Sequence, residues 1–252
     1  MLVVISPAKK LNENCKNSLI PKFTIPPHLD NSKKIVNTLR KYSSSSLAKL
    51  MNVSEKISNL NYDRYLKWSL PFNKNNSHPA LLLFQGDVYK GISADDFEKE
   101  DFAFAQKSLR ILSGLYGILK PLDLIQPYRL EMGTPLKIGK HKDLYQFWGE
   151  EITKSINKEK NHDFLINLAS AEYFKSINTE SLKPKLINIA FKEKRNGNYK
   201  IIGIHAKKAR GLMSRYIIKN KISDPKKLKK FNYEKYQYNP KLSSDNEWVF
   251  TR

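Results

Sequence analysis

The residues with the clearest capacity for chemistry lie in one basic segment, residues 205–215. Apolar residues recur there at three- and four-residue spacing and continue to 217, which predicts a helix with one buried face. Gly211 and Ser214 fall on the opposite face, although an interior glycine costs about 1 kcal/mol relative to alanine. Small residues there would admit a phosphate to the backbone, beside the cations Lys207, Lys208, Arg210 and Arg215. Alternatively, Gly211 lets another element pack and the cations form a solvated face.

Polar side chains also follow three short apolar runs, 2–5, 80–84 and 164–168, which read as buried strands. The polar residues after these runs are Ser6, Lys9, Lys10, Asp87 and Glu172. Ligands of open α/β sheets bind beyond the carboxyl ends of strands, so these side chains are site candidates by position. A solvated lysine or a turn-forming aspartate is the ordinary alternative.

The segment 110–133 is punctuated by glycines and prolines, which predicts loops of specific shape. Arg110 and Arg129 are two of only eight arginines in the chain. Glu131 lies two residues beyond Arg129, on the same side of an extended segment. Pairing of Arg129 with Glu131 and contact of either with a substrate both remain open.

Residues 29–68 carry helical periodicity, with the outline of a helix-hairpin-helix between residues 57 and 65. Such a hairpin presents backbone N–H groups to a DNA phosphate and needs positive φ in its turn. Asn59 would take that position, because asparagine tolerates the left-handed conformation best after glycine. Its neighbours Asn61 and Arg64 would lie near the same phosphate. An ordinary helical connection is the alternative.

The remaining elements complete a mixed α/β fold, which we expect to form one domain over residues 1–252. Residues 144–156 suggest an amphipathic helix, and 93–109 one or two more. Runs at 186–191 and 199–204 flank Asn196-Gly197, a strong hairpin signal. The second arm of that hairpin would lead directly into the basic helix.

Composition excludes several classes of protein. The 252 residues contain no apolar run long enough to cross a membrane, and the start lacks the pattern of a signal peptide, so we expect a cytoplasmic protein. Cys15 is the only cysteine and the five histidines are scattered, so we expect no metal site. We also expect no cofactor.

The net charge of +21 favours a polyanionic partner. Most basic residues are lysines in a chain rich in Asn and Ile, which A·T-rich coding would also produce. Distribution is the better indicator, because residues 183–235 hold 17 basic and 3 acidic residues. The C-terminal third therefore carries most of the positive field.

Taken in order, these motifs resemble the YaaA peroxide-stress-resistance family over nearly the whole chain. The matching segments are Ile5-Ser6-Pro7-Ala8-Lys9, Gly86-Asp87-Val88-Tyr89, Leu112-Ser113-Gly114-Leu115-Tyr116-Gly117, Pro121-Leu122-Asp123-Leu124, Pro127-Tyr128-Arg129-Leu130-Glu131-Met132-Gly133, Leu144-Tyr145-Gln146-Phe147-Trp148, Asn167-Leu168-Ala169-Ser170 with Glu172-Tyr173, and Ala206-Lys207-Lys208-Ala209-Arg210-Gly211. The resemblance implies a mixed α/β "cantaloupe" fold with a helix-hairpin-helix. It also implies a basic cleft for duplex or locally unpaired DNA, protection against hydrogen peroxide, and lower free intracellular iron.

Two functional hypotheses follow, with a third behind them. In the first, the protein binds double-stranded or bubble-containing DNA without catalysis, and Lys9, Lys10, Arg110 and Arg129 join the basic helix as expected DNA contacts. In the second, it is an enzyme acting on a nucleotide or nucleobase, with Asp87, Glu131 or Glu172 as general base and Lys9 or Arg129 stabilising negative charge; Ser6 and His205 belong to the same motifs. The third, an RNA- or ribosome-associated protein, depends on charge and on Tyr233, Tyr236 and Tyr238. We expect no protein partner.

Overall fold

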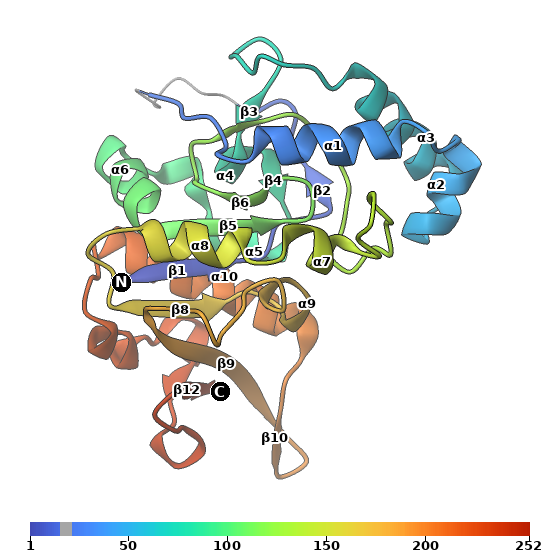
Figure 1. Ribbon diagram of the computed structural model, residues 1–252. Helices are drawn as coiled ribbons and strands as arrows, with labels where there is room; N and C mark the ends of the chain where they lie inside the picture. The colour runs from blue at the N-terminus through green and yellow to red at the C-terminus, as the bar shows by residue number, and fades with distance from the viewer. Residues whose placement is uncertain (16–21) are drawn as a thin grey trace.

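The computed structural model describes residues 1–15 and 22–252. A mixed sheet runs through its centre in the order β11-β12-β9-β8-β1-β5-β6, and β10 pairs with β9 (Figure 1). The strands of this sheet are β1 (Leu2–Ile5), β5 (Leu109–Ser113), β6 (Gly117–Leu119), β8 (Phe164–Leu168), β9 (Lys185–Arg195), β10 (Asn198–Lys200), β11 (Gln237–Tyr238) and β12 (Glu247–Thr251). The predicted mixed α/β class is confirmed.

The middle strand, β1, determines where a ligand could bind. All four of its residues are buried, and it pairs in parallel with β5 on one side and β8 on the other. Continuous burial on both faces explains why the segment is uniformly apolar rather than alternating. Since the chain leaves β1 between two parallel neighbours, its carboxyl end is a topological switch point of the kind that hosts ligands in open α/β sheets.

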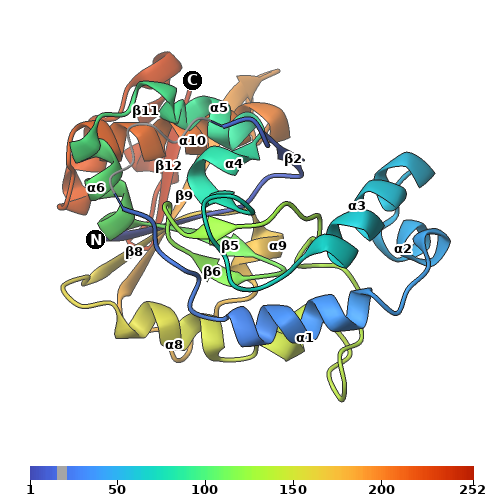
Figure 2. The ribbon, with the colours of Figure 1, turned by 90° about the horizontal axis from the view of Figure 1, so that it is seen from above.

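Helices cover both faces of the sheet (Figure 2). The face nearer the viewer in Figure 1 carries α1 (Leu29–Leu39), α7 (Leu144–Trp148) and α8 (Glu151–Lys158). The opposite face carries α5 (Asp87–Ile92), α6 (Lys99–Ser108) and α10 (Gly203–Lys219). Two further helices, α2 (Ser44–Met51) and α3 (Glu55–Lys67), project beyond the sheet on the side where β1 ends.

The closest contact between helices is the crossing of α5 and α10 at Gly91 and Gly211. A Cβ added to Gly211 would lie 1.9 Å from the carbonyl oxygen of Val88 and 2.9 Å from the Cα of Gly91. A Cβ added to Gly91 would lie 2.4 Å from the carbonyl oxygen of Lys208. The two backbones are therefore in direct contact, and only glycine fits at either position.

The far end of α10 is tied to α6 by ion pairs. Lys219 donates to the largely buried carboxylate of Asp101 at 2.8 Å, and Lys221 donates to the same group. Burial alone would raise the pKa of Asp101, but these two ammonium groups lower it to about 2. Asp101 thus stays ionised and anchors the helix at neutral pH.

Several predicted elements need correction. The apolar run 80–84 is not a strand, because Ala80–Leu83 forms the short helix α4 between the two-residue strands β3 (His78–Pro79) and β4 (Phe84–Gln85). β3 pairs with β7 (Leu124–Ile125), and β4 pairs with β2 (Lys10–Leu11). Burial makes such a run apolar in either conformation, so periodicity could not distinguish them.

The segment 110–133 is not made of loops alone, since it contains β6, β7 and most of β5. The predicted helix 144–156 is interrupted at Gly149, which has φ of 46° and separates α7 from α8. The Asn196-Gly197 hairpin is confirmed, with φ of 48° and 81° at the two turn residues. Its second arm is shorter than predicted, because α10 already begins at Gly203.

In the described residues, no helix combines the length and apolar character required to cross a membrane.

The glycine crossing generates a stability prediction. We expect Gly211→Ala to lower the free energy of unfolding by about 3 kcal/mol, the upper part of the usual range for overpacking, because backbone atoms cannot rotate away. Gly203→Ala on the same helix is the matched control, since nothing lies within 4 Å of its added Cβ. Denaturant unfolding should leave that control within about 0.5 kcal/mol of the parent protein. Equal losses for the two variants would contradict this account.

Candidate functional site

The loops that follow β1 and β8 meet at the carboxyl edge of the sheet. The backbone N–H of Ser170 donates to Ser6 Oγ at 2.8 Å, and Ser6 Oγ donates to Ser170 Oγ at 3.3 Å. The hydroxyl of Tyr89, from α5, donates to the carbonyl oxygen of Ser6 at 3.1 Å. Burial raises the pKa of Tyr89, so it remains a neutral donor. Polar residues that follow β1 and β8 therefore lie side by side at this edge.

Beside these loops lies a pocket of about 380 Å³, which we call the charged pocket. Its lining residues are Lys9, Leu50, Met51, Asn52, Arg129, Glu131, Gly133, Thr134, Pro135 and Glu172. Glu131 is the centre of its charge network, because Lys9 Nζ lies 2.6 Å from one carboxylate oxygen and an Arg129 nitrogen 3.2 Å from the other. The predicted pairing of Arg129 with Glu131 is confirmed, and because both residues line the pocket, contact with a substrate stays a prediction.

Glu172 enters the charged pocket from the short helix α9 (Ala171–Phe174). Its Oε1 accepts the backbone N–H of Gly133 at 3.0 Å, and its backbone carbonyl accepts the hydroxyl of Tyr145 at 2.9 Å. A side chain at position 133 would approach Glu172 Oε1 to 3.2 Å, so glycine keeps this contact close. Next to it, Tyr173 has a raised pKa, chiefly because of burial and also because of the tyrosine and glutamate charges around it.

The structure brings together only part of the carboxylate set proposed for catalysis. Glu131 and Glu172 line the same pocket, whereas Asp87 opens α5 and is not among the lining residues. His205 lies elsewhere, where its Nδ1 is 2.7 Å from the buried carboxylate of Glu193. Glu193 also accepts from Tyr236 at 3.0 Å and from Arg252 at 2.8 Å, a network that fixes the start of α10.

The predicted open face of α10 is wrong. Gly211 faces the backbone of α5, and Ser214 is 1 % exposed and donates to the carbonyl of Arg210. Arg215 is held by Asp96 at 2.8 Å and by the carbonyl oxygens of Ile92 and Ser93. The alternative stated for Gly211 is therefore confirmed, because the small residues let α10 pack against another helix, α5. Lys207 and Lys208 are exposed, and Lys208 pairs with Glu234.

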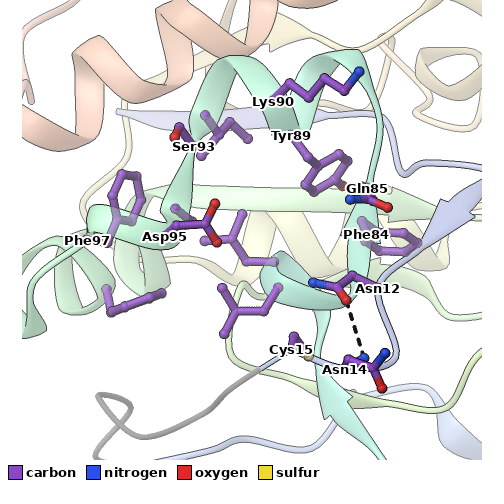
Figure 3. Close-up of a pocket in the computed structure, with 15 residues that line it drawn as sticks. Asn12, Asn14, Cys15, Phe84, Gln85, Tyr89, Lys90, Ser93, Asp95 and Phe97 are labelled. Carbon is purple, nitrogen blue, oxygen red and sulfur yellow. Dashed lines mark hydrogen bonds between the residues drawn. The ribbon is translucent and has the colours of Figure 1, made fainter.

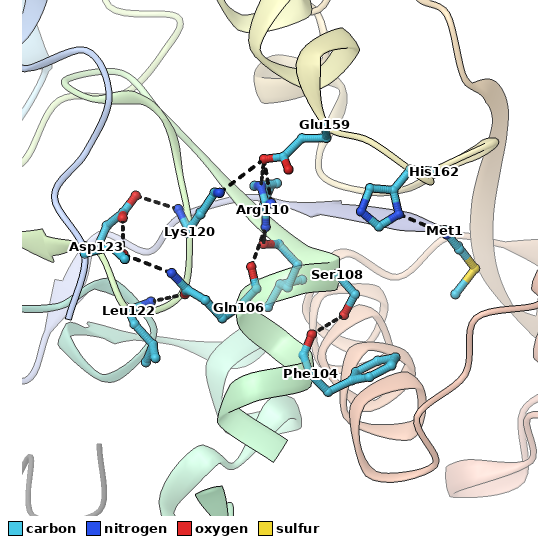
Figure 4. Close-up of polar contacts among 12 residues, drawn as sticks. Met1, Phe104, Gln106, Ser108, Arg110, Lys120, Leu122, Asp123, Glu159 and His162 are labelled. Atoms are coloured by element: carbon cyan, nitrogen blue, oxygen red, sulfur yellow. Dashed lines mark hydrogen bonds and ion pairs between the residues drawn. The ribbon is translucent and has the colours of Figure 1, made fainter. Parts of the chain in front are cut away.

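Arg110 is also inaccessible. Its side chain is 3 % exposed and donates to Glu159 at 2.6 Å and to the carbonyl oxygens of Gln106 and Leu109 (Figure 4). The strand position of Arg110 explains this burial, since Arg110 lies opposite Val4 where β5 pairs with the buried strand β1. A DNA contact for Arg110 is excluded by this geometry, because its donors are already used inside the protein.

The predicted helix-hairpin-helix turn between residues 57 and 65 is wrong. Residues 57–65 all lie inside α3, so Asn59 occupies a helical position and accepts a hydrogen bond from Ser44. Asn61 is 1 % exposed and donates to the carbonyl of Ile57, and Arg64 pairs with Glu13. The residue with positive φ is Asn52, at 49°, in the turn between α2 and α3.

Asn52 is the residue that sequence reasoning missed, and it lines the charged pocket. The available signal was an asparagine followed two residues later by Ser54, which precedes the first turn of α3. Helices α2 and α3, which we call the helical arm, are fixed against the pocket by Tyr65. The Tyr65 hydroxyl donates to the carbonyl oxygen of Arg129. Lys10, predicted with Lys9, lies in β2 with an exposed side chain and does not line this pocket.

A second cavity, of about 610 Å³, lies beside α5 (Figure 3). Asn12, Asn14 and Cys15 border it on one side, and Phe84, Gln85 and Tyr89 on another. None of the predicted site residues lines it. Its lining is mostly neutral, so the charged pocket is the better candidate for binding an ionic ligand. Among the described residues, no three His, Cys, Asp or Glu side chains gather as a metal site would require.

Comparison with known proteins gives a consistent result. A family model described as peroxide stress protein YaaA matches residues 1–242. A UPF0246 protein of Acaryochloris marina is 52 % identical over 253 residues, covering 100 % of both chains. UPF0246 proteins of Colwellia psychrerythraea and Teredinibacter turnerae are 52 % and 50 % identical, each covering 100 % of this chain and 99 % of the relative.

The charge network of the pocket generates a second prediction. We expect Glu131→Gln to lower the free energy of unfolding by about 1–2 kcal/mol, because Arg129 is mostly buried and loses a charged acceptor. Lys9 should add little to this loss, since it is 61 % exposed. Glu151→Gln is the control, as its ion pair with Lys154 is exposed on both sides. Denaturant titration should give a change below about 0.5 kcal/mol for that control; a parent-like Glu131→Gln protein would show that the network is not stabilising.

Proposed function

Because the chain belongs to the peroxide stress protein YaaA family, we propose that it acts in the response to hydrogen peroxide by binding DNA. The observation that supports this best is that the turn of a helical hairpin and two cations share one pocket. Asn52 lies in that turn, and Lys9 and Arg129 line the same charged pocket. We propose a cytoplasmic location, where bacterial DNA is accessible.

The first turn of α3 is a suitable phosphate contact. Ser54 precedes this helix of 13 residues without a side-chain capping bond, so the first-turn N–H groups can donate to a phosphate oxygen. Lys56 lies in the same turn with an exposed side chain. A phosphate bound at this turn would contact the helical arm, which the Tyr65 hydrogen bond holds against the backbone of Arg129.

The distribution of charge supports a polyanionic partner. Two of the three acidic residues in the basic segment 183–235, Glu193 and Glu234, are already paired with Arg252. The exposed lysines of that segment therefore retain most of their positive electrostatic potential. This potential attracts DNA over a distance set by the ionic strength. Lower free intracellular iron, implied by the resemblance, remains part of this proposal as an effect of the stress response. We do not propose iron binding at Glu131, because its carboxylate already pairs with two cations.

Salt-dependent fluorescence anisotropy on duplex, bubble-containing duplex and single strand tests DNA binding. We expect Lys9→Ala and Lys56→Ala each to weaken binding and to reduce the slope of log affinity against log salt by about 0.9 for each lost phosphate contact on duplex. Lys160→Ala removes the same charge from the loop before β8, at the opposite edge of the sheet. If all three variants lose affinity equally, the contact is a diffuse charge effect and the proposed surface is wrong.

The second candidate function, an enzyme acting on a nucleotide or nucleobase, is favoured by one feature. Two carboxylates and two cations line one pocket at the switch point of the sheet. Non-specific DNA binding requires only positive charge, so it does not account for the two carboxylates. Glu172 or Glu131 would serve as general base, with Lys9 or Arg129 stabilising developing negative charge.

Peroxide survival of cells separates this candidate from DNA binding alone. If the protein is an enzyme, Glu172→Gln should abolish protection while leaving DNA affinity and expression level unchanged, because the amide can still accept from Gly133 but cannot take a proton. Glu180→Gln, at an exposed position outside the pocket, serves as control. Full protection by Glu172→Gln would remove Glu172 as a base.

A further inference from the structure

Arg210, on α10, is a partly buried cation without a counter-ion. Its Nε is fully buried and makes no hydrogen bond, and among residues 1–15 and 22–252 no carboxylate lies within ion-pair distance of its guanidinium. The segment outside the described residues, 16–21, contains no acidic residue that could supply one. Burial lowers the pKa of the Arg210 guanidinium.

The other partly or fully buried arginines of the described residues differ, because their guanidinium groups have partners. Arg40 also lacks an ion pair within that part of the chain, but it donates to the carbonyl oxygens of Tyr65, Leu66 and Trp68. Arg110 donates to Glu159 and to two carbonyl oxygens. Arg129 and Arg64 also have a buried Nε without a partner, but each pairs through another nitrogen, with Glu131 and Glu13 respectively. Burying an unpaired charge is costly, so proteins pair such groups or use them to bind a ligand.

Lys207 adds a second cation on the same side of the helix. It lies three residues before Arg210, the spacing at which helical side chains are neighbours. Lys207 is exposed and has no ion pair within the described part of the chain. Long helical side chains lean toward the helix N-terminus, and α10 begins beside Glu193, near the carboxyl end of β9. Both cations are therefore displaced toward the carboxyl edge of the sheet.

We infer that Arg210 and Lys207 form a binding site for a phosphate dianion, either inorganic phosphate or the terminal phosphate of a monoester. Two uncompensated positive charges match the charge of about −1.5 to −2 that a phosphate monoester carries at pH 7, whereas a phosphodiester carries one. The planar guanidinium donates to two phosphate oxygens at once, and the ammonium group adds a point charge. This site uses residues outside the charged pocket and does not depend on the proposed DNA-binding surface.

Thermal unfolding in inorganic phosphate, against chloride at equal ionic strength, tests the site. The parent protein should melt several degrees higher in phosphate, because a ligand that binds only the folded state stabilises it. Arg210→Met should lose this phosphate-dependent rise while melting in chloride at or above the parent temperature, since it removes an unpaired buried charge and retains most of the apolar volume. Arg210→Lys keeps the charge and should retain part of the rise.

Arg110→Met is the matched control, because it removes an arginine whose bonds are all internal. It should melt below the parent protein in both salts and keep the phosphate-dependent rise. If Arg210→Met instead destabilises the protein as much as Arg110→Met does, and phosphate stabilises the parent no more than chloride, Arg210 is a structural residue and the inference is overturned.

The source of the phosphate is resolved by two paired ligands. Stabilisation by adenosine monophosphate but not adenosine would identify a nucleotide site. Tighter binding of 5′-phosphorylated than of unphosphorylated duplex, lost in Arg210→Met, would identify a nucleic-acid end. Either result supports the phosphate site at Arg210 and Lys207. Either result also remains valid if Lys9→Ala and Lys56→Ala leave DNA affinity unchanged, so the phosphate site and the DNA-binding surface can fail separately.

Discussion

The backbone contact between Gly91 and Gly211 is the constraint on which the rest of this face depends. It lets α5 and α10 approach until main-chain atoms touch, a separation that any side chain would prevent. α5 is thereby held where Tyr89 can donate to the carbonyl of Ser6, which fixes the loop after β1. α10 is held where the Nε of Arg210 is buried without a partner. One pair of glycines thus positions the loop that leads to the charged pocket and also partly buries Arg210, the neighbour of Gly211 in the sequence.

Local patterns were sufficient for the elements whose structure is decided locally. β1 and β8 were predicted from short apolar runs, and the β9–β10 turn from Asn196-Gly197. The residues 80–84 were misassigned because apolarity reports burial and not backbone conformation. β5 was missed because its second residue is Arg110, whose charge is neutralised by Glu159, a residue 49 positions away that no local window contains.

The candidate site was predictable where position in a sheet determines it and not where tertiary packing does. Polar residues after β1 and β8 had to meet, since parallel strands end at one edge. Asn52 and Asn59 are equivalent in propensity, and only the true helix boundary decides which one takes positive φ. Gly211 illustrates the same limit, because an interior glycine signals close approach without specifying whether a ligand or a helix approaches.

The charged pocket and the Arg210 site differ in the free-energy cost of binding an anion. In the charged pocket, Glu131 pairs with both Lys9 and Arg129, so an anionic ligand has to displace a carboxylate and gains only the difference between the old and the new ion pairs. At Arg210 the buried Nε and the rest of the guanidinium have no partner among the described residues, so an anion has no carboxylate to displace. Electrostatic attraction in such a site is stronger than at the surface, because the surrounding protein screens less than water. A protein arranged in this way should bind a long polyanion through many weak, salt-sensitive contacts and hold a single small dianion more tightly per charge.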